Sequence, residues 1–434
     1  MAILTSPLDQ KKPTAAKDSR RRSSLISDSL AHPRASYYLV LVPTVLLLAI
    51  GMLMVWSASS VFGYVRFDDA YYFVKRQVFF LVIGGLAAFV LSKCSTGTLR
   101  VLGWVLVVVS LGLQILTFTP LGWGEAKGNR NWVQFGTSFF RIQPSELAKL
   151  AIIVWGADLL SRKQKLLDQP KHLLFPFIPV SAVLIGLVVL NRDLGTGMVM
   201  GAIVMAMLWH VGASWRMLAS IAGTVVAVVV LLIATSINRM DRILGFFNSG
   251  HDVMGVNLQP LRGVFALATG GWWGVGLGAS RQKWGSLAEA HTDYVLAIVG
   301  EELGLVGTLL VLALFGAVAY AAIRLAINTA DPFVRYVAAG VTIWLMSQMI
   351  INIGMVLALL PVIGIPLPLV SYGGSALVPS MVALGLLVGF ARAEPEAAAA
   401  LRDRRGAARK SGKVTLPGAI SAGAARARAR SRRG

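Results

Sequence analysis

The sequence predicts an all-α integral membrane protein of about ten transmembrane helices, with a large extracellular loop between spans 7 and 8. Of its 434 residues, 56% are hydrophobic and only 14% are charged, whereas soluble proteins carry about 25% charged residues. Apolar runs long enough to cross a bilayer as a helix recur along most of the chain. Much of the net charge of +21 lies at the two ends, with 7 Lys/Arg before residue 38 and 12 after residue 391.

The apolar runs divide the chain into a membrane domain, residues 38–391, between two basic tails. The expected spans are 38–60, 77–93, 101–119, 144–160, 173–190, 194–212, 216–236, 293–324, 333–358 and 367–390. The eighth is longer than a bilayer requires, so its first turns should protrude or tilt. The loop before it covers 236–292. The polar tails 1–37 and 392–434 are expected to be disordered.

Basic residues beside apolar spans favour a cytoplasmic location, so we expect both termini in the cytoplasm. The same charges suit contacts with anionic membrane lipids. In a soluble protein a charge of +21 would suggest nucleic acid, but here we expect no nucleic-acid partner. The first residues contain no apolar segment of the kind that signal peptides have, so no cleavable leader is expected.

A polar stretch, Glu289 to Gly304, opens the eighth span. If the helix begins at Asp293, the residues Asp293, Glu301 and Gly304 share one face. Ionisable groups at such a position are costly and usually face a cavity, which makes them functional candidates. The alternative is structural: Asp293 caps the helix, and the glutamates are interfacial charges.

The fourth span begins with a polar sequence that includes Gln143, Ser145, Glu146 and Lys149. A lysine this far inside a helix must extend to the interface or meet a carboxylate. Either Glu146 and Lys149 form a self-contained pair, or Lys149 also faces another acid or a ligand phosphate. In the next short turn, Asp193 is placed to cap the helix that contains Thr196.

Two further segments suggest an outward-facing polar cavity. The glycine-rich run 270–278 could bind an anion through backbone amides, with Arg281 and Lys283 nearby, although glycine content alone is a weak signal. Three prolines and a Gly-Gly pair in 360–375 predict a broken or re-entrant segment, which membrane proteins tolerate only inside protein or along a cavity. His291 has no second histidine at metal-ligand spacing, so zinc is not expected.

These motifs, in this order, resemble the SEDS family of membrane peptidoglycan glycosyltransferases, and its division branch more than its elongation branch. The matching segments are Arg141–Lys149, Asp193–Thr196, Gly274–Gly278, Glu289–Tyr294, Gly300–Gly304, Asn352–Gly354 and Pro366–Gly374. The resemblance spans about residues 38–391. The chain departs from the family pattern where Arg192 replaces a proline, where Arg262-Gly263 replaces Gln-Ser, and where Asn131 precedes Trp132 in place of arginine.

The resemblance implies polymerisation of lipid II, a disaccharide-pentapeptide on undecaprenyl pyrophosphate, by an inverting displacement at the outer face. It makes Asp293 the general base, with Lys149 and Glu146 as further catalytic residues. The predicted substrate-binding residues are Arg141, Gln143, Ser145, Asp193, Thr196, Gln259, Arg281, Gln282, Lys283, His291, Thr292, Glu301, Ser371 and Tyr372. Pyrophosphate chemistry adds a divalent cation, Mg or Mn, whose ligands are unknown. No organic cofactor is implied.

The family also implies partners and a place in the cell. A cognate class B penicillin-binding protein, which is a transpeptidase, should pack against the spans, and other division proteins should join at the septum of the cytoplasmic membrane. Two alternatives stay open. A lipid II flippase could use the same cavity, and a non-catalytic scaffold of the division machinery would need none of these residues for chemistry.

Overall fold

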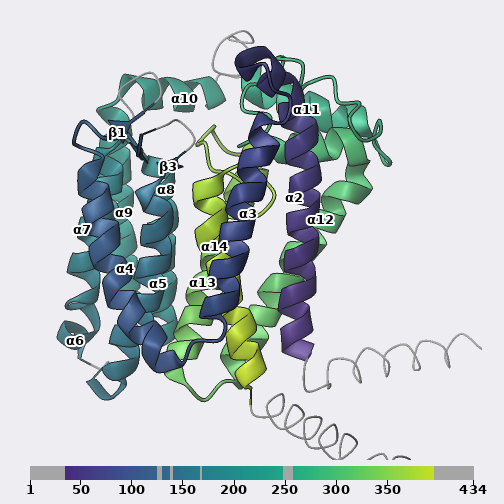
Figure 1. Cartoon of the computed structure of the whole chain (residues 1–434). Coiled ribbons are helices and arrows are strands. Elements are labelled where there is room, and N and C mark those ends of the chain that lie inside the picture. The colour runs from purple at the N-terminus through teal and green to yellow at the C-terminus, as the bar shows by residue number, and fades with distance from the viewer. Residues whose placement is uncertain (1–34, 125–129, 137–139, 167–168, 248–257, 395–434) are drawn as a thin grey trace, which may run out of the picture. The chain divides into compact units, whose positions relative to one another are not determined.

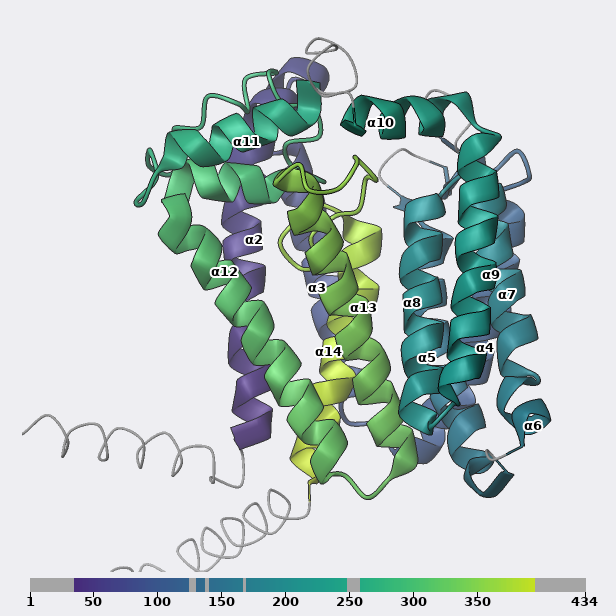
Figure 2. The same cartoon turned by 180° about the vertical axis from the view of Figure 1, so that it is seen from behind.

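The computed structural model describes residues 35–124, 130–136, 140–166, 169–247 and 258–394. Both predicted tails lie almost wholly outside these residues. The described chain forms one compact unit, Ser36–Ala391. Long helices run roughly parallel through it, and shorter elements cover one end (Figures 1 and 2). We call that end, which carries the three strands and α10, the outer end, because its loops are those predicted to face outward.

Helices make up most of the unit. They are α2 (Ala35–Phe67), α3 (Tyr72–Leu91), α4 (Thr96–Leu116), α5 (Pro144–Arg162), α6 (Pro170–Leu174), α7 (Phe177–Leu190), α8 (Leu194–Val211), α9 (Trp215–Ala234), α10 (Ile237–Phe247), α11 (Leu258–Gly270), α12 (Val295–Asn328), α13 (Pro332–Val356) and α14 (Gly374–Ala393), with a 3-10 turn at Gln164–Leu166. The predicted loop 236–292 therefore contains two helices, α10 and α11.

A small antiparallel sheet departs from the predicted all-helical fold. Its strands are β1 (Gly122–Trp123), β2 (Trp132–Gln134) and β3 (Arg141–Ile142), in the order β1-β2-β3. Val133 pairs with Gly122 on one side and with Ile142 on the other. The sheet brings the chain back to the outer end of α5, so it fixes where that helix begins.

Nine helices in the described part of the chain are long and apolar enough to cross a membrane. The fourth predicted span is α5, which fails that measure because it carries Glu146, Lys149, Asp158 and Arg162. Sixteen of its 19 residues are nevertheless buried, and it packs against α4, α8 and α13. Glu146, Lys149 and Asp158 are thus enclosed by protein, whereas the Arg162 side chain, at the end of the helix, is 61% exposed. Enclosure of the three inner charges is how a helix of this composition can lie within the bundle.

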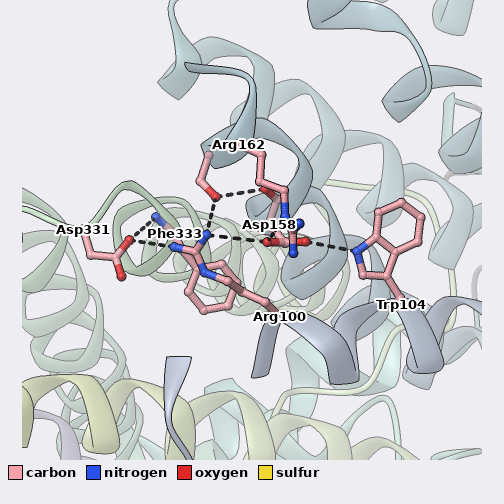
Figure 3. Close-up of polar contacts among 7 residues, drawn as sticks. Arg100, Trp104, Asp158, Arg162, Asp331 and Phe333 are labelled. Carbon is pink, nitrogen blue, oxygen red and sulfur yellow. Dashed lines mark hydrogen bonds and ion pairs between the residues drawn. The ribbon is translucent and has the colours of Figure 1, made fainter. Parts of the chain in front are cut away.

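Charged residues join α5 to its neighbours at the inner end (Figure 3). Asp158 is fully buried and accepts hydrogen bonds from Trp104 Nε1 at 3.0 Å and Arg162 Nε at 2.8 Å. Arg100 lies 3.6 Å from Asp158 and 3.1 Å from Asp331, which caps α13 through the backbone N–H of Phe333. Arg100 thereby connects α4, α5 and α13.

The eighth span, α12, is not the single straight helix that the sequence predicted. It begins at Val295, two residues after Asp293, and is broken at Gly304, where φ is 69° and ψ is −167°. The predicted common face of Asp293, Glu301 and Gly304 is therefore wrong. Figure 2 shows α12 bending at its upper end, below α11, and then descending through the bundle. The expected tilt of the first turns is confirmed.

The glycine-rich loop supplies the hydrogen bonds that the break in α12 removes. The N–H groups of Leu305 and Val306 donate to the carbonyl oxygens of Gly271 and Trp272, at 2.9 and 3.2 Å. The carbonyl oxygens of Glu301 and Glu302 accept from the N–H groups of 275 and 276, at 2.9 and 3.1 Å. Backbone groups at a helix end need partners, and this loop provides them on both sides of the break.

The predicted broken segment is confirmed between α13 and α14. Residues 357–373 contain no helix, and α14 begins at Gly374, seven residues after the predicted start of the last span. Ile365, Leu367 and Val370 are buried. Gly51 of α2 lies so close to the backbone at Leu369 that a Cβ there would collide with it. The part 365–371 is therefore mostly enclosed by protein, as membrane proteins require of irregular backbone, whereas 357–364 is half-buried or exposed.

Candidate active site

Asp293 lies in a tight turn that leads into α12. The N–H groups of Thr292 and Tyr294 both donate to the carbonyl oxygen of Glu289, at 3.1 Å. The side chain of Asn352, on α13, donates to the carbonyl oxygen of Asp293 at 2.7 Å and to that of Ile365 at 2.8 Å. Asp293 is half-buried, and a Cβ placed on Gly364 would lie 3.3 Å from its Oδ2. Its carboxylate thus lies beside the irregular segment at the outer end.

The same segment is held to the Asp293 turn from its other end. The N–H of Tyr372 donates to the carbonyl oxygen of His291 at 2.9 Å, and Ser371 Oγ accepts from the N–H of Leu367 at 2.8 Å. His291 is buried among the rings of Phe62, Phe73 and Tyr372. Burial lowers its pKa, and the nearby Glu289 opposes this. In this structure these three predicted binding residues shape the backbone around Asp293.

Glu146 and Lys149 form the pair that their spacing allows. Lys149 Nζ lies 2.8 Å from Glu146 Oε1, and both side chains are buried. The ammonium group also lies 5.2 Å from the centre of the Trp344 ring. Glu146 Oε2 has no hydrogen-bond partner among the described residues. The self-contained pair is therefore present, and the assignment of either residue to catalysis stays a prediction.

Asp193 caps α8, as its position predicted. Its carboxylate accepts from the N–H and the hydroxyl of Thr196, at 2.9 and 2.8 Å, and from Gln143 Nε2 at 3.2 Å. Gly195 lies so close to Ile363 that a Cβ would collide with that side chain. The start of α8 therefore packs on the segment that carries Gly364, so the helix that Asp193 caps and the Asp293 carboxylate both adjoin the same irregular segment.

Arginines that the sequence analysis did not select lie near both carboxylates. Arg242, on α10, donates to the carbonyl oxygen of Val362 at 3.0 Å. Burial and the Asp293 carboxylate raise the pKa of Tyr294, and the Arg242 guanidinium opposes this shift. Arg242 thus contacts the segment whose Gly364 adjoins the Asp293 carboxylate. Burial and Arg192 lower the pKa of Arg239, and Asp193 opposes this. The amphipathic pattern of residues 237–247 could have indicated the helix that carries these arginines, but the sequence analysis assigned these residues to a long loop.

A second basic group adjoins the other end of the irregular segment. Burial raises the pKa of Tyr372 to about 12, while the charges of Arg76 and Arg141 act to lower it. Arg141 stacks over Trp123 at 3.5 Å and donates to Gln134 Oε1 at 3.0 Å. The predicted residue Arg141 therefore does lie at the outer end beside this segment, on the small sheet. Basic side chains flank the segment near Val362 and near Tyr372.

Four predicted residues lie in a separate cluster, between the break in α12 and the glycine-rich loop. Glu301 is buried and accepts from Ser280 Oγ and from the N–H of Arg281. Lys283 is buried, donates to the carbonyl oxygen of Gly278, and lies 3.5 Å from Glu302. The side chain of Arg281 is exposed and that of Gln282 is half-buried. Their contacts hold the loop on α12.

Two other predicted residues stabilise the turn before Asp293. Gln259 Nε2 donates to the carbonyl oxygen of Ala288 at 3.0 Å, and Thr292 Oγ1 lies 2.6 Å from Glu289 Oε2. In the part of the chain that the structure describes, no three His, Cys, Asp or Glu side chains group together as metal ligands. The described residues thus offer no dedicated metal cage.

The fold and the site define a class: a multi-pass helical membrane protein whose outer end holds a half-buried carboxylate beside an irregular segment that basic side chains flank. Comparison with known proteins identifies the family. The model FTSW_RODA_SPOVE, described as "Cell cycle protein", matches residues 37–395. The chain belongs to this family, which confirms the SEDS resemblance.

Relatives and solved structures agree with this assignment. The "Probable peptidoglycan glycosyltransferase FtsW" of Mycobacterium bovis is 37% identical over 92% of this chain and 75% of its own length. "Stage V sporulation protein E" of Bacillus subtilis is 37% identical over 82% of this chain and 96% of its own. A chain from the solved structure "Structural coordination of polymerization and crosslinking by a peptidoglycan synthase complex" matches with a TM-score of 0.66, at 25% identity over 82% of this chain and 97% of that chain. The rod shape determining protein RodA of Thermus thermophilus matches with a TM-score of 0.59, at 25% identity over 82% and 97%.

Proposed function

We propose that this chain is a peptidoglycan glycosyltransferase that polymerises lipid II into β-1,4 glycan strands during cell division. The observation that carries the proposal is the Asp293 turn. It is held by Asn352 and by the irregular segment at the outer end, with Arg242 close by. The names of its FtsW relatives state the same activity, and the structural neighbour belongs to a peptidoglycan synthase complex.

Asp293 would act as the general base. It takes the proton from the 4-hydroxyl of the acceptor sugar while that oxygen attacks C1 of the donor sugar. The new C1–O bond forms as the bond from C1 to the pyrophosphate oxygen breaks, with inversion at C1. The undecaprenyl pyrophosphate that leaves carries negative charge, so positive groups fixed near it stabilise the transition state. Arg242, which donates to the segment beside Asp293, suits one phosphate, and Arg141 and Arg76 suit the second.

A divalent cation, Mg or Mn, remains part of the proposal. Because the described residues contain no cluster of three ligands, the pyrophosphate itself would supply most of the oxygen ligands, as is common for Mg²⁺. Chelation should stop polymerisation and added Mg or Mn should restore it. Full activity in excess chelator would remove the cation from the proposal.

We also propose a class B penicillin-binding protein, a transpeptidase, as the membrane partner, with other division proteins and membrane lipids around the complex. The structural neighbour comes from a peptidoglycan synthase complex that coordinates polymerisation with crosslinking, and this supports the pairing. The proposed place is the division septum of the cytoplasmic membrane, with both termini in the cytoplasm. Co-purification of this chain with the transpeptidase from membranes tests the pairing, and its absence under mild detergent would count against it.

The decisive experiment measures glycan polymer made from purified lipid II by the co-purified complex. The wild type should make polymer, and Asp293→Asn should make none while it still binds lipid II. Asp241→Asn, which removes an exposed carboxylate on α10, is the matched control and should stay active. Polymer from Asp293→Asn would remove Asp293 from the chemistry. No polymer from any variant, with lipid II moved across vesicle membranes, would favour a flippase. If the protein neither makes polymer nor moves lipid II, the scaffold is favoured.

The same assay tests the phosphate contact. Arg242→Gln should lower kcat/KM by about 10- to 100-fold, since it removes a charge-assisted contact worth roughly 1.5–3 kcal/mol. Arg216→Gln removes an exposed arginine at the start of α9 and should have no such effect. Equal activity of the two variants would exclude Arg242 from substrate binding.

A further inference from the structure

A small polar pocket lies between α4, the first turn of α5 and the turn that joins α7 to α8. Its polar lining consists of Gln114, Thr117, Asn131, Ser145, Asn191 and Asp193. The volume within which the centre of a water-sized group can lie is about 10 Å³. The pocket therefore has room for one such group. Asn131 and Asp193 are half-buried, so the pocket opens at their side.

Four polar atoms of this lining have no hydrogen-bond partner among the described residues. They are both amide atoms of Gln114, Oδ1 of Asn131 and Oγ of Ser145. Gln114 is 1% exposed and Ser145 is 5% exposed. A buried polar group without a partner costs about 1–3 kcal/mol, and such groups are rare. Four of them around one small cavity indicate that a ligand completes the hydrogen bonds.

The unpaired atoms select the chemistry of that ligand. Asn191 Nδ2 already donates to Thr117 Oγ1 at 2.6 Å, and the Asp193 carboxylate is occupied by Gln143 and Thr196. The remaining set has two acceptors, the Gln114 and Asn131 oxygens; one donor, Gln114 Nε2; and the Ser145 hydroxyl, which can do either. An anion would be repelled by the Asp193 carboxylate and by the two acceptor oxygens. A cation would give the Gln114 Nε2 donor no acceptor. A neutral hydroxyl or amide fits.

The pocket is connected to the proposed base through short contacts. Asp193 begins α8, Gly195 packs on Ile363, and the next residue, Gly364, lies beside the Asp293 carboxylate. We propose that this pocket is a subsite that recognises a neutral hydroxyl or amide group on the sugar-peptide part of the substrate. The inference rests on the proposed function and assigns Gln114 and Asn131 a part in it.

Lipid II binding to the full-length protein in complex with its transpeptidase tests this subsite. Affinity is measured in the Asp293→Asn background, and KM and kcat are measured with Asp293 intact. Gln114→Leu and Ser145→Ala should each raise Kd and KM by about 3- to 10-fold with kcat nearly unchanged, the size expected for a lost neutral hydrogen bond. Ser181→Ala is the matched control. It removes a buried, unpaired hydroxyl on α7 that does not line the pocket, and it should change neither constant.

The outcomes separate the two proposals. Unchanged affinity in both pocket variants, with only a lower melting temperature, means that the pocket holds a resident water, and the subsite is overturned while the proposed function stands. If the protein with an intact pocket binds no lipid II at all, the proposed function and the subsite both fail. If Gln114→Leu does not fold, Ser145→Ala decides alone, because it removes a single oxygen.

Discussion

The side-chain amide of Asn352 donates to the carbonyl oxygen of Asp293 at 2.7 Å. Its second N–H donates to the carbonyl oxygen of Ile365 at 2.8 Å. One buried side chain on α13 thus fixes the turn that carries the proposed base and the irregular segment beside it. The position of the Asp293 carboxylate therefore depends on a residue that need not touch the substrate.

Replacing Asn352 should impair turnover more than substrate binding. Asn352→Leu keeps the size of the side chain but removes both hydrogen bonds, so the carboxylate loses its fixed position. A displacement of about 1 Å can cost a factor of roughly 100 in rate, and we expect kcat to fall by about 10- to 100-fold with KM nearly unchanged. Gln348→Leu, one turn earlier on the same helix, should have a smaller effect. A wild-type kcat for Asn352→Leu would contradict the positioning role.

The break in α12 should not tolerate a side chain at Gly304. Its φ of 69° lies in the region that favours glycine, and a Cβ would collide with the backbone at Gly274. Gly304→Ala should therefore lower stability by about 1–3 kcal/mol or more. Gly316→Ala, later in the same helix and with open space around it, should be neutral or slightly stabilising. The melting temperatures of the two variants in detergent test this. Equal melting temperatures would show that position 304 accepts a side chain and would contradict the prediction.

Burial of His291 predicts a loss of stability in mild acid. Its pKa lies below its ordinary value of 6.5 in the folded protein. Below about pH 6.5 the unfolded chain therefore binds a proton that the folded protein does not. Above pH 6.5 the protonation of His291 does not reduce the free energy of unfolding. As the pH falls from there toward the lower folded pKa, the free energy of unfolding decreases by up to about 1.4 kcal/mol per pH unit. His291→Phe should pack against Phe62 and Phe73 and remove this part of the acid dependence of the melting temperature. An unchanged dependence would exclude His291 as its source.

The inner cluster in Figure 3 should matter more for stability through Asp158 than through Asp331. Asp158 is fully buried. Asp158→Ala removes the acceptor of Trp104 Nε1 and Arg162 Nε and leaves Arg100 with Asp331 as its carboxylate partner, which should cost roughly 1.5–3 kcal/mol. The Asp331 side chain is 34% exposed, and Asp331→Ala should cost about 1 kcal/mol, mainly as a lost helix cap. Melting temperatures of the two variants test this order. The reverse order would mean that the Arg100–Asp331 contact holds the helices together.

The sequence predicted the parts of the fold that depend on local pattern. Apolar runs located the spans, the spacing of Glu146 and Lys149 indicated a carboxylate partner for the lysine, and the prolines before Tyr372 indicated irregular backbone. The break at Gly304 was missed because helical periodicity assumes a continuous helix, and the bend depends on a loop some 30 residues earlier in the chain. Arg242 was missed for a related reason. Only the packing of α10 across the outer end brings it near Asp293.

In the candidate site, too, contacts within one helix could be predicted from the sequence, and contacts between distant segments could not. Asp193 as a helix cap and Glu146 with Lys149 as a pair follow from spacing within one helix, and the structure has both contacts. Lys283 and Glu301 were grouped with the substrate because of their charge and position in the motif. Their partners come from α2, α12 and the glycine-rich loop. Which charge faces which partner is decided by tertiary packing, and no single-sequence pattern records it.

The hydrogen bonds between α12 and residues 271–276 also bear on how the protein is inserted into the membrane. A broken span leaves amide and carbonyl groups that hydrocarbon cannot satisfy. Here their partners lie in a loop that is predicted to face outward and would therefore have to cross the membrane first. The bent form of α12 is therefore complete only after that loop has been translocated and has folded back onto it. We therefore expect this span to reach its final form only together with the loop, and a chain whose loop stays on the inner side would expose unpaired backbone groups at the break.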